Sequence, residues 1–487
     1  MASSPRSAWA IVAGGAIVVT AASAAVWRPA RAARTPGAPG ASTALGYVGS
    51  SSCLPCHPGE HASWSRTWHR TMTQPATPDT VLAPFERRGP RGHEEVWYEG
   101  KRVVLTTGAH REQAYWAAGE RGALEILPVV WLPQERALVP RRDAFILPPD
   151  EPLPTVRWGG SCIACHAVAG EPHRDAAKDA WDTRVAELGV ACEACHGPGA
   201  AHAEQYRDPV ARYSKAADKH IVHPAKLDAA RSNAVCGQCH AYAYPRDDRG
   251  WWRDGYSKTF RAGDALGPSR MLLDPGAMSG DNGAPEIDAP ASAIFWPDGD
   301  VRVGGREYNA LVLSKCKATC VDCHSLHAGD PAGQLAPDRT CTTSCHASAR
   351  MTTHAKHSAA VTCADCHMPK TSYALLSAVR SHRISIPRLE DDDGKPSACH
   401  LCHLDRDDWA ARVGARGDAG LRALVADALG ASPNARYARP ILDALGKDRY
   451  AAVRFIVERS KRKLPPVDGL SPITLAAPDE RAMTIAE

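Results

Sequence analysis

Apolar and polar positions change their spacing several times along the chain, and each change predicts a different element. Residues 8–27 are apolar almost without interruption, which is typical of a signal peptide or a membrane anchor. Between about 90 and 135, apolar and polar residues alternate at 95–98 and 102–105, and a Glu-Gly pair separates the two segments. A period of two broken by a turn dipeptide predicts a β-hairpin inside a small β-rich insert.

The spacing becomes helical near the C-terminus. From 406 to 465, Ala, Leu and Val recur every three or four positions, and Gly430 and Pro433 interrupt them. This pattern predicts an α-helical appendage of two or three short helices. Residues 466–487 are rich in Pro and are expected to form a poorly ordered tail.

The remaining segments read mainly as short helices and loops. Residues 28–46 are rich in Ala, Gly and Pro and predict a linker. Within the main domain, 47–405, we expect a helical connector at 177–188. Residues 242–315 predict loops with a small hairpin around 295–299. The expected fold is therefore mainly α-helical and irregular, with the β-rich insert and the helical appendage added.

Composition changes this picture in one respect. The 487 residues include only 5 Phe, against 17 Cys and 21 His. A core of this size ordinarily uses more Phe, which suggests that flat apolar groups other than side chains fill part of the interior. The formal net charge is only +4, so nothing indicates nucleic acid as a partner.

The cysteines occur in pairs, and a histidine follows each pair. Seven copies read C-x-x-C-H, where about 0.03 are expected by chance, and an eighth copy reads C-x-x-x-C-H. The paired cysteines are Cys53, Cys56, Cys162, Cys165, Cys192, Cys195, Cys236, Cys239, Cys320, Cys323, Cys341, Cys345, Cys363, Cys366, Cys399 and Cys402. The histidines that follow them are His57, His166, His196, His240, His324, His346, His367 and His403.

This spacing has a chemical reason. Two thiols separated by two residues reach the two vinyl groups on one edge of a haem, and the next residue then lies beneath the iron, where an imidazole is a good ligand. The motifs therefore predict haem c at eight sites, seven strict and one, at Cys341 and Cys345, with a longer loop. Each motif histidine is the predicted proximal iron ligand.

Other chemistry of paired cysteines fits less well. Redox-active pairs and zinc sites do not require histidine at the next position, and disulfide scaffolds suit short secreted domains. For the expanded motif, a disulfide or a free pair of thiols stays open as an alternative. Cys316 is the one cysteine outside the motifs, and we assign it no chemical role.

The second axial ligand of each iron decides what the haem can do. Thirteen histidines lie outside the motifs, more than the eight irons require. Weaker candidates for distal ligands are His61, His93, His173, His220, His223 and His400. The favoured candidates are His69, His110, His202, His327, His357 and His382.

Two strings resemble a known superfamily. Residues 192–199 with His202, and the C-H-M-P string in 363–370, resemble multihaem proteins related to cytochrome c-554 and hydroxylamine oxidoreductase. The resemblance covers about 47–405 and is closest to octahaem members with a C-terminal region of HEAT or TPR type, which 450–457 resembles. It implies closely stacked haems, and in catalytic members one haem with an open or Lys-bound site.

This sequence departs from the catalytic members because it contains no C-x-x-C-K motif. We therefore expect extracytoplasmic electron transfer through mostly bis-His haems. The alternative is an oxidoreductase for small nitrogen or sulfur oxyanions such as nitrite, hydroxylamine or tetrathionate, with the Cys341 and Cys399 motifs as candidates for an open haem.

The location and partners follow from the haem chemistry. C-type haems are attached after export, so we expect a periplasmic or other extracytoplasmic protein, either soluble or anchored by its N-terminus. The expected partners are a redox protein or quinol-oxidising donor and an extracytoplasmic acceptor. The C-terminal helices are a candidate surface for protein docking.

Overall fold

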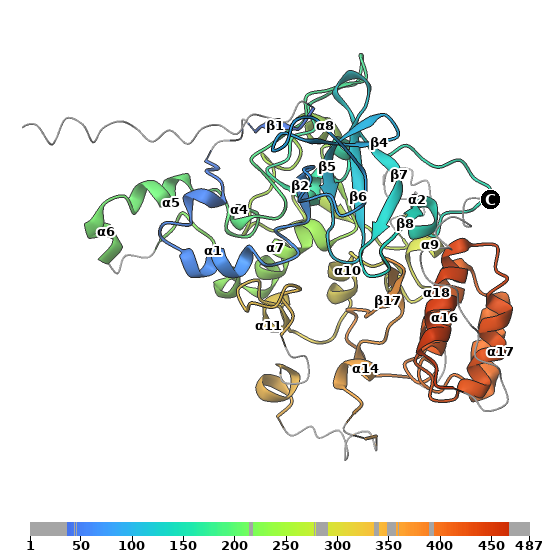
Figure 1. Cartoon of the computed structure of the whole chain (residues 1–487). Helices are drawn as coiled ribbons and strands as arrows, with labels where there is room; N and C mark the ends of the chain where they lie inside the picture. Colours follow the sequence, from blue (N-terminus) through green and yellow to red (C-terminus); the bar gives the residue numbers. More distant parts are fainter. Residues whose placement is uncertain are drawn as a thin grey trace, which may run out of the picture.

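The computed structural model describes residues 37–466, except 43, 45, 214–217, 277, 279–290, 336–339, 348–356, 359 and 389–393 (Figure 1). The signal or anchor segment at 1–27 and the tail from 467 lie outside the described residues, so both stay predictions. Within the described residues, no helix is long and apolar enough to cross a membrane.

A seven-stranded antiparallel sheet forms the largest β-structure. Its strands are β2 (Thr73–Pro75), β3 (Glu86–Arg88), β4 (Glu95–Tyr98), β5 (Lys101–Thr107), β6 (Gln113–Ala118), β7 (Leu124–Leu132) and β8 (Ala137–Pro140). The order is β3-β4-β5-β6-β7-β8, and β2 pairs with β5. The predicted hairpin is confirmed: Tyr98 pairs with Lys101 across Glu99 and Gly100, both of which have positive φ. The sheet begins before the predicted insert and ends after it.

Strand β5 is buried on both faces. Val103 packs on one face with Tyr115, while Val104 packs on the other with Trp116 and Trp158. The second cluster also contains Ile163, which lies inside the second cysteine motif. The sheet therefore supports that motif directly, and this is how the β-rich part of the chain takes part in the site.

Short helices and turns carry the cysteine motifs. The helices before the C-terminal region are α1 (Pro58–Trp64), α2 (Arg141–Ala144), α3 (Ile163–His166), α4 (Cys192–His196), α5 (Ala200–Gln205), α6 (Pro209–Tyr213), α7 (Ala229–His240), α8 (Asp248–Asp254), α9 (Ala291–Ile294), α10 (Glu307–Val312), α11 (Cys320–Cys323) and α14 (Cys363–His367). Turns of 3-10 or π type are η1 (Ser50–Ser52), η2 (Glu120–Gly122), η3 (Trp158–Gly160), η4 (Pro224–Lys226), η6 (Cys341–Cys345) and η7 (Arg406–Asp408).

Small two-stranded pairings join these helices. They are β1 (Gly40–Ala41) with β12 (Arg184–Val185), β9 (Ala167–Val168) with β13 (Glu187–Leu188), β10 (Arg174–Asp175) with β11 (Ala180–Trp181), β14 (Ala243–Pro245) with β15 (Arg270–Leu272), and β16 (Ser372–Ala374) with β17 (Ser377–Val379). The helical connector predicted at 177–188 is wrong, because three short strands occupy it. β11 forms a local hairpin with β10, whereas β12 and β13 pair with the earlier strands β1 and β9. The small hairpin predicted near 295–299 is confirmed by the antiparallel bridge between Phe295 and Val301.

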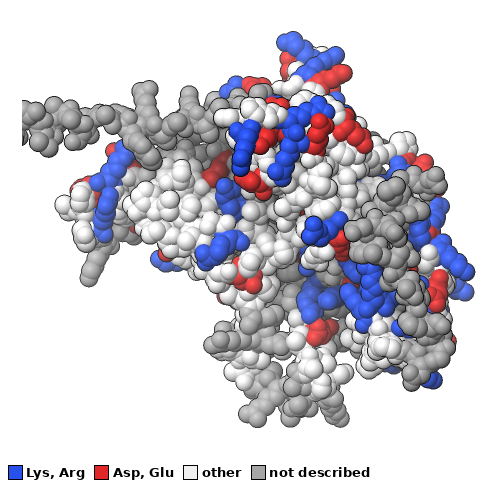
Figure 2. Space-filling view, in the orientation of Figure 1, with Lys and Arg blue, Asp and Glu red and all other residues white. Residues whose placement is uncertain are grey.

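Charged side chains of both signs are interspersed on the face of the molecule in Figure 2. Lys and Arg lie next to Asp and Glu over the sheet and over the C-terminal helices, in keeping with the small net charge. The part of this face over α1 and α4 carries few charges. No single-sign field on this face points to a polyanionic partner.

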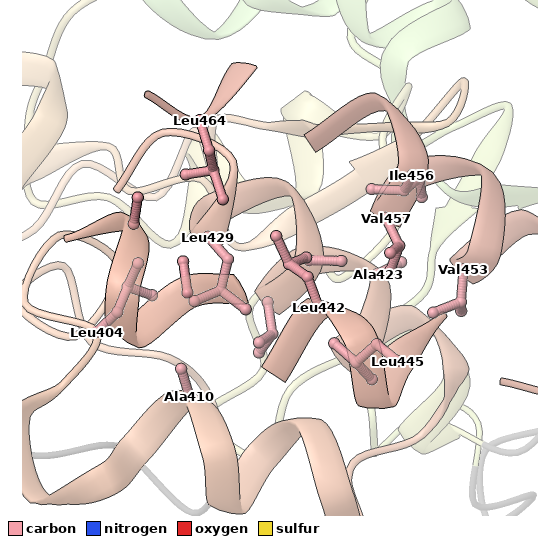
Figure 3. Packing of buried hydrophobic residues seen from close by; sticks show 14 of the residues in the cluster. Leu404, Ala410, Ala423, Leu429, Leu442, Leu445, Val453, Ile456, Val457 and Leu464 are labelled. Carbon is pink, nitrogen blue, oxygen red and sulfur yellow. The ribbon is translucent and has the colours of Figure 1, made fainter. Parts of the chain in front are cut away.

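Four helices lie in the described part of the C-terminal region, where two or three were predicted. They are α15 (Trp409–Arg416), α16 (Ala419–Leu429), α17 (Ala435–Leu445) and α18 (Ala451–Lys463). Asp418 and Asn434 cap α16 and α17 by accepting hydrogen bonds from backbone N–H groups, which explains where these helices begin. Their apolar faces form one core around Leu429, Leu442 and Ile456 (Figure 3).

The C-terminal helices pack on the rest of the chain. Leu421 and Leu424 of α16 bury Trp296, and Arg302 pairs with Asp418 at 2.6 Å. The helices therefore cover part of the preceding domain as well as enclosing a core of their own.

Candidate functional site

Most of the cysteine motifs fold as single tight turns, and the fourth forms the C-terminal turn of α7. In such a turn, residues i, i+3 and i+4 lie on one face, which places two thiols and one imidazole side by side. In four of the motifs the backbone N–H of the histidine donates to the backbone carbonyl of the first cysteine at 2.8–2.9 Å. These histidines are His57, His166, His324 and His403. Thr319 and Thr362 form capping boxes with Asp322 and Asp365, so the sequence itself starts these turns.

The expanded motif keeps this arrangement with one more residue. Residues Cys341–Cys345 form a π-type turn, and the N–H of His346 donates to the carbonyl of Cys341 at 2.8 Å. The extra residue is absorbed by a wider turn, while the hydrogen bond from histidine to the first cysteine is preserved. No disulfide joins the cysteines of any motif.

Five motif histidines face a histidine from outside the motifs. In every one of these pairs, one ring belongs to a motif and the other to a favoured distal candidate. The pairs and their ring-centroid distances are His57–His202 (6.0 Å), His240–His69 (6.3 Å), His196–His327 (6.3 Å), His324–His382 (6.3 Å) and His403–His357 (6.4 Å).

These distances fit a metal between the rings. A metal–imidazole bond is about 2.0 Å long and the ring centroid lies about 1.1 Å beyond the nitrogen, so two axial imidazoles have centroids about 6.2 Å apart. The observed separations of 6.0–6.4 Å match this value. The residues present therefore fit haem with two axial histidines at five motifs.

Hydrogen bonds orient several of these rings. The Nδ1 atoms of His196 and His367 lie 2.7 Å from the carbonyls of Val222 and Ser385, and Nδ1 of His240 lies 2.7 Å from Glu307. A ring that donates from Nδ1 presents Nε2 to a metal, which is the usual arrangement at histidine–metal sites.

Burial keeps some of these rings neutral and hence able to bind a metal. Burial lowers the pKa of His69 and of His166 to about 4. For the carboxyl group of Glu307, burial and the neighbouring His240 shift the pKa in opposite directions. Burial alone would raise its pKa, but the hydrogen bond and charge of His240 lower it to about 2. Glu307 is therefore a carboxylate held against a predicted iron ligand.

Three motif histidines lie outside these five pairs. Among the described residues, no histidine ring faces His166 or His346, whereas His367 has further contacts. His166 lies against the sheet, with Nδ1 3.4 Å from the hydroxyl of Thr73. His110 does not face a motif histidine either: it is exposed, and its ring stacks on Trp68 at 3.6 Å.

The motifs lie close to one another. The side chain of Cys53 lies beside that of Cys192, and the side chain of Cys236 lies beside that of Cys320. Sγ of Cys165 lies 3.6 Å from the carbonyl oxygen of Cys239. These contacts bring together the attachment edges of motifs one and three, four and five, and two and four.

The later motifs continue this network. The thiol of Cys323 lies near that of Cys341, so motifs five and six are neighbours. The thiol of Cys366 lies near that of Cys399, so motifs seven and eight are neighbours. Residues 382–385 join motifs five and seven, because His382 faces His324 while the carbonyl of Ser385 accepts from His367.

Comparisons with known proteins agree with this chemistry. The profile of the Cytochrome c552 family matches residues 347–419, which contain the seventh and eighth motifs. The chain is similar to multihaem c-type cytochromes. This similarity implies covalently bound haem c, the cofactor that the motifs predict.

Two named proteins are similar to this chain. It is 26% identical over 259 residues to the multiheme cytochrome MtrA of Shewanella baltica (strain OS185), a match that takes up 50% of this chain and 53% of MtrA. It thus spans about half the length of that relative. The outer cell wall cytochrome OcwA has the same fold, with a TM-score of 0.51 and 20% identity over 86% of this chain and 100% of OcwA.

Sequence reasoning missed the groups that support the imidazoles. Glu307 and Asp218 hydrogen-bond to His240 and His202, but each lies in a different segment from its partner. A carboxylate shows no sequence signal for such a role, because only the fold brings it to the ring.

Proposed function

We propose that this cytochrome transfers electrons outside the cytoplasm through eight covalently attached haems. Each motif supplies two cysteines for attachment and one proximal histidine. His69, His202, His327, His357 and His382 serve as distal ligands to the motif histidines that they face. The observation that carries this proposal is the set of five imidazole pairs with centroids 6.0–6.4 Å apart.

Closed coordination favours electron transfer over catalysis. When bound, haem c supplies reversible one-electron chemistry at its iron. Two protein imidazoles on one iron leave no position for a substrate. The chain's own residues then hold each ring in place, as Val222 and Glu307 do for His196 and His240.

The contacts between motifs support a continuous path. Motif one lies next to motif three, and motif four lies next to motifs two and five. Gln238 of motif four donates to the carbonyl of Ala194 in motif three at 2.8 Å, which completes the series. From motif five the path divides, towards motif six through Cys341 and towards motifs seven and eight through residues 382–385. Such a branched path suits a protein that accepts electrons at one end and releases them at another.

The location and partners belong to the same proposal. Haem attachment after export places the protein in the periplasm or beyond, with 1–27 as a signal peptide or anchor. Its donor is a redox protein or a quinol-oxidising enzyme, and its acceptor is extracytoplasmic. MtrA and OcwA are themselves cytochromes, and OcwA is named for the outer cell wall.

The proposed number of eight haems can be tested by measuring the haem content of the protein. A pyridine haemochrome assay combined with intact-mass analysis is expected to give eight haems per chain. Seven haems would remove the expanded motif at Cys341 and Cys345 from the account. A value far below seven would contradict the proposal as a whole.

One observation favours a second function. Among the described histidines, none faces His166 or His346, so the haems of motifs two and six are the candidates for an open iron in a multihaem oxidoreductase for small nitrogen or sulfur oxyanions. The eighth motif, which the sequence had suggested as open, has His357 facing His403. Added nitrite, hydroxylamine or tetrathionate would shift the spectrum of one haem if this function were correct. An unchanged spectrum would leave electron transfer alone.

The C-terminal helices have a separate proposed role. Their HEAT-like or TPR-like character and a docking function stay proposals, supported by the compact four-helix core around Leu429 and Leu442. A deletion from residue 407 that leaves partner binding unchanged would contradict the docking role.

A further inference from the structure

One buried guanidinium lies beside the attachment cysteines of motifs two and four. Arg270, on β15, has only 3% of its surface exposed. It lines a cavity together with Cys165 and Cys239, one cysteine from each motif. Tyr256 and Phe260 form the aromatic side of the same cavity.

The positive charge of this side chain is not neutralised by the described residues. One terminal nitrogen donates to the carbonyl of Gln238 at 2.6 Å, and the guanidinium carbon lies 3.7 Å from the ring centroid of Tyr256. The Nε atom is buried without a hydrogen-bond partner, and no carboxylate of the described residues pairs with it. Burial lowers the pKa of Arg270, although the group stays charged at neutral pH.

A fixed buried cation acts on any redox centre nearby. Reduction adds one negative charge to a haem, so a cation beside it stabilises the reduced form relative to the oxidised form. A unit charge about 10 Å away, at an effective dielectric constant of about 20, changes the equilibrium constant of reduction by about tenfold. An exposed cation at the same distance acts much more weakly because water and salt screen it.

We propose that Arg270 raises the reduction potential of the haems attached through Cys165 and Cys239, and most of all that of motif two. The inference rests on the proposed haem sites. Two other charges lie near these two motifs. Arg306 adds to the positive potential near Cys165 and His166 of motif two, while the carboxylate of Glu307 is hydrogen-bonded to His240 of motif four. Because that carboxylate opposes Arg270 at motif four, the larger effect falls on motif two. The haem held against the sheet would then be the one that most readily keeps an electron.

Charge-removing variants at Arg270 test this assignment. Spectroelectrochemical titration of the full-length, haem-loaded protein is compared for wild type, R270Q, R270M and R270K. In R270Q and R270M, the reduction equilibrium constant of at least one haem is expected to fall about tenfold, which is 59 mV for a one-electron couple. R270K keeps the charge and is expected to stay close to wild type. R261Q, which removes an exposed arginine on the same cavity, is the matched control and is expected to leave the titration unchanged.

Haem content is measured for every variant so that the outcomes can be separated. Titration curves of R270Q and R270M that coincide with wild type at full haem content would overturn the role of Arg270. Loss of haem in both variants would also overturn it, because the residue would then be needed for assembly and not for tuning. A wild-type protein without haem at these motifs would instead contradict the proposed function.

Discussion

At the residue scale, the groups expected to tune the haem reduction potentials are side chains that contact the predicted iron ligands or lie beside the attachment cysteines. The carboxylate of Glu307 lies 2.7 Å from Nδ1 of His240 and is itself half-buried. A carboxylate that accepts from a ligating imidazole makes the ring a stronger donor, which favours the oxidised iron. This contact and the Arg270 cation therefore push neighbouring haems in opposite directions.

Replacing Glu307 tests the first of these effects. E307Q is expected to raise the reduction potential of one haem, by the equivalent of about a tenfold change in its reduction equilibrium constant. Spectroelectrochemical titration measures this shift, and E204Q, at an exposed carboxylate paired with Arg207, is the control. A titration of E307Q identical to that of wild type would show that the contact does not tune the haem.

Removing a distal candidate tests the imidazole pairs. His69 faces His240, and its neutral ring is suited to bind iron. H69A is expected to convert one haem from low spin to high spin without loss of haem, because the attachment cysteines remain. EPR measures the change, with H93A, at an exposed histidine, as the control. Unchanged low-spin signals in H69A would exclude His69 as a ligand.

The sequence allowed the attachment cysteines and the proximal histidine of each site to be predicted, but not which distal histidine faces them. Cysteines and histidine at i, i+3 and i+4 meet within one helical turn, so their arrangement depends on neighbouring residues alone. The pairing of His69 with His240, or of His202 with His57, depends on the tertiary fold. Candidate distal histidines could be named from their number, but their assignment to motifs could not.

At the element scale, the expanded motif shows how a turn accommodates an extra residue. The π-type turn of Cys341–Cys345 keeps the hydrogen bond from His346 to Cys341. The double variant C341S/C345S is therefore expected to carry one haem fewer per chain than wild type, by pyridine haemochrome assay. C316S, at the cysteine outside the motifs, is expected to keep the full number. Equal haem content in the double variant and wild type would mean that this motif holds no haem.

A buried ion cluster fixes the segment that carries His382. Asp300 is fully buried and accepts from Lys395 and from the hydroxyl of Ser381, each at 2.7 Å. D300N leaves Lys395 with less compensation, so it is expected to lower the free energy of unfolding by about 3 kcal/mol. Denaturant unfolding measures this loss, and D418N, at an exposed carboxylate, is expected to change little. Equal stability of D300N and wild type would contradict the role of the cluster.

At the scale of the whole molecule, the accuracy of the sequence predictions followed the range of the interactions. Helical periodicity located the C-terminal region, where each helix has its own cap and apolar face. The sheet is larger than predicted because β2 and β3 are only three residues long and show no clear alternation. Residues 177–188 form strands and not a helix, since their pairing partners at 40–41, 167–168 and 174–175 are set by the fold.

The motifs form one network because distant segments supply both axial rings. His202 follows the third motif yet faces the first, and His327 follows the fifth yet faces the third. Each bound haem would therefore fasten segments that are far apart in the sequence, so that cofactor attachment and folding depend on each other.

The most direct test of this account is quantitative low-temperature EPR of the fully oxidised protein. The central claim is that most haems have two histidine ligands. Low-spin ferric signals are expected for at least the five haems with facing imidazoles, and these signals are expected not to change when nitrite or hydroxylamine is added. High-spin signals from the majority of the haems would contradict the central claim.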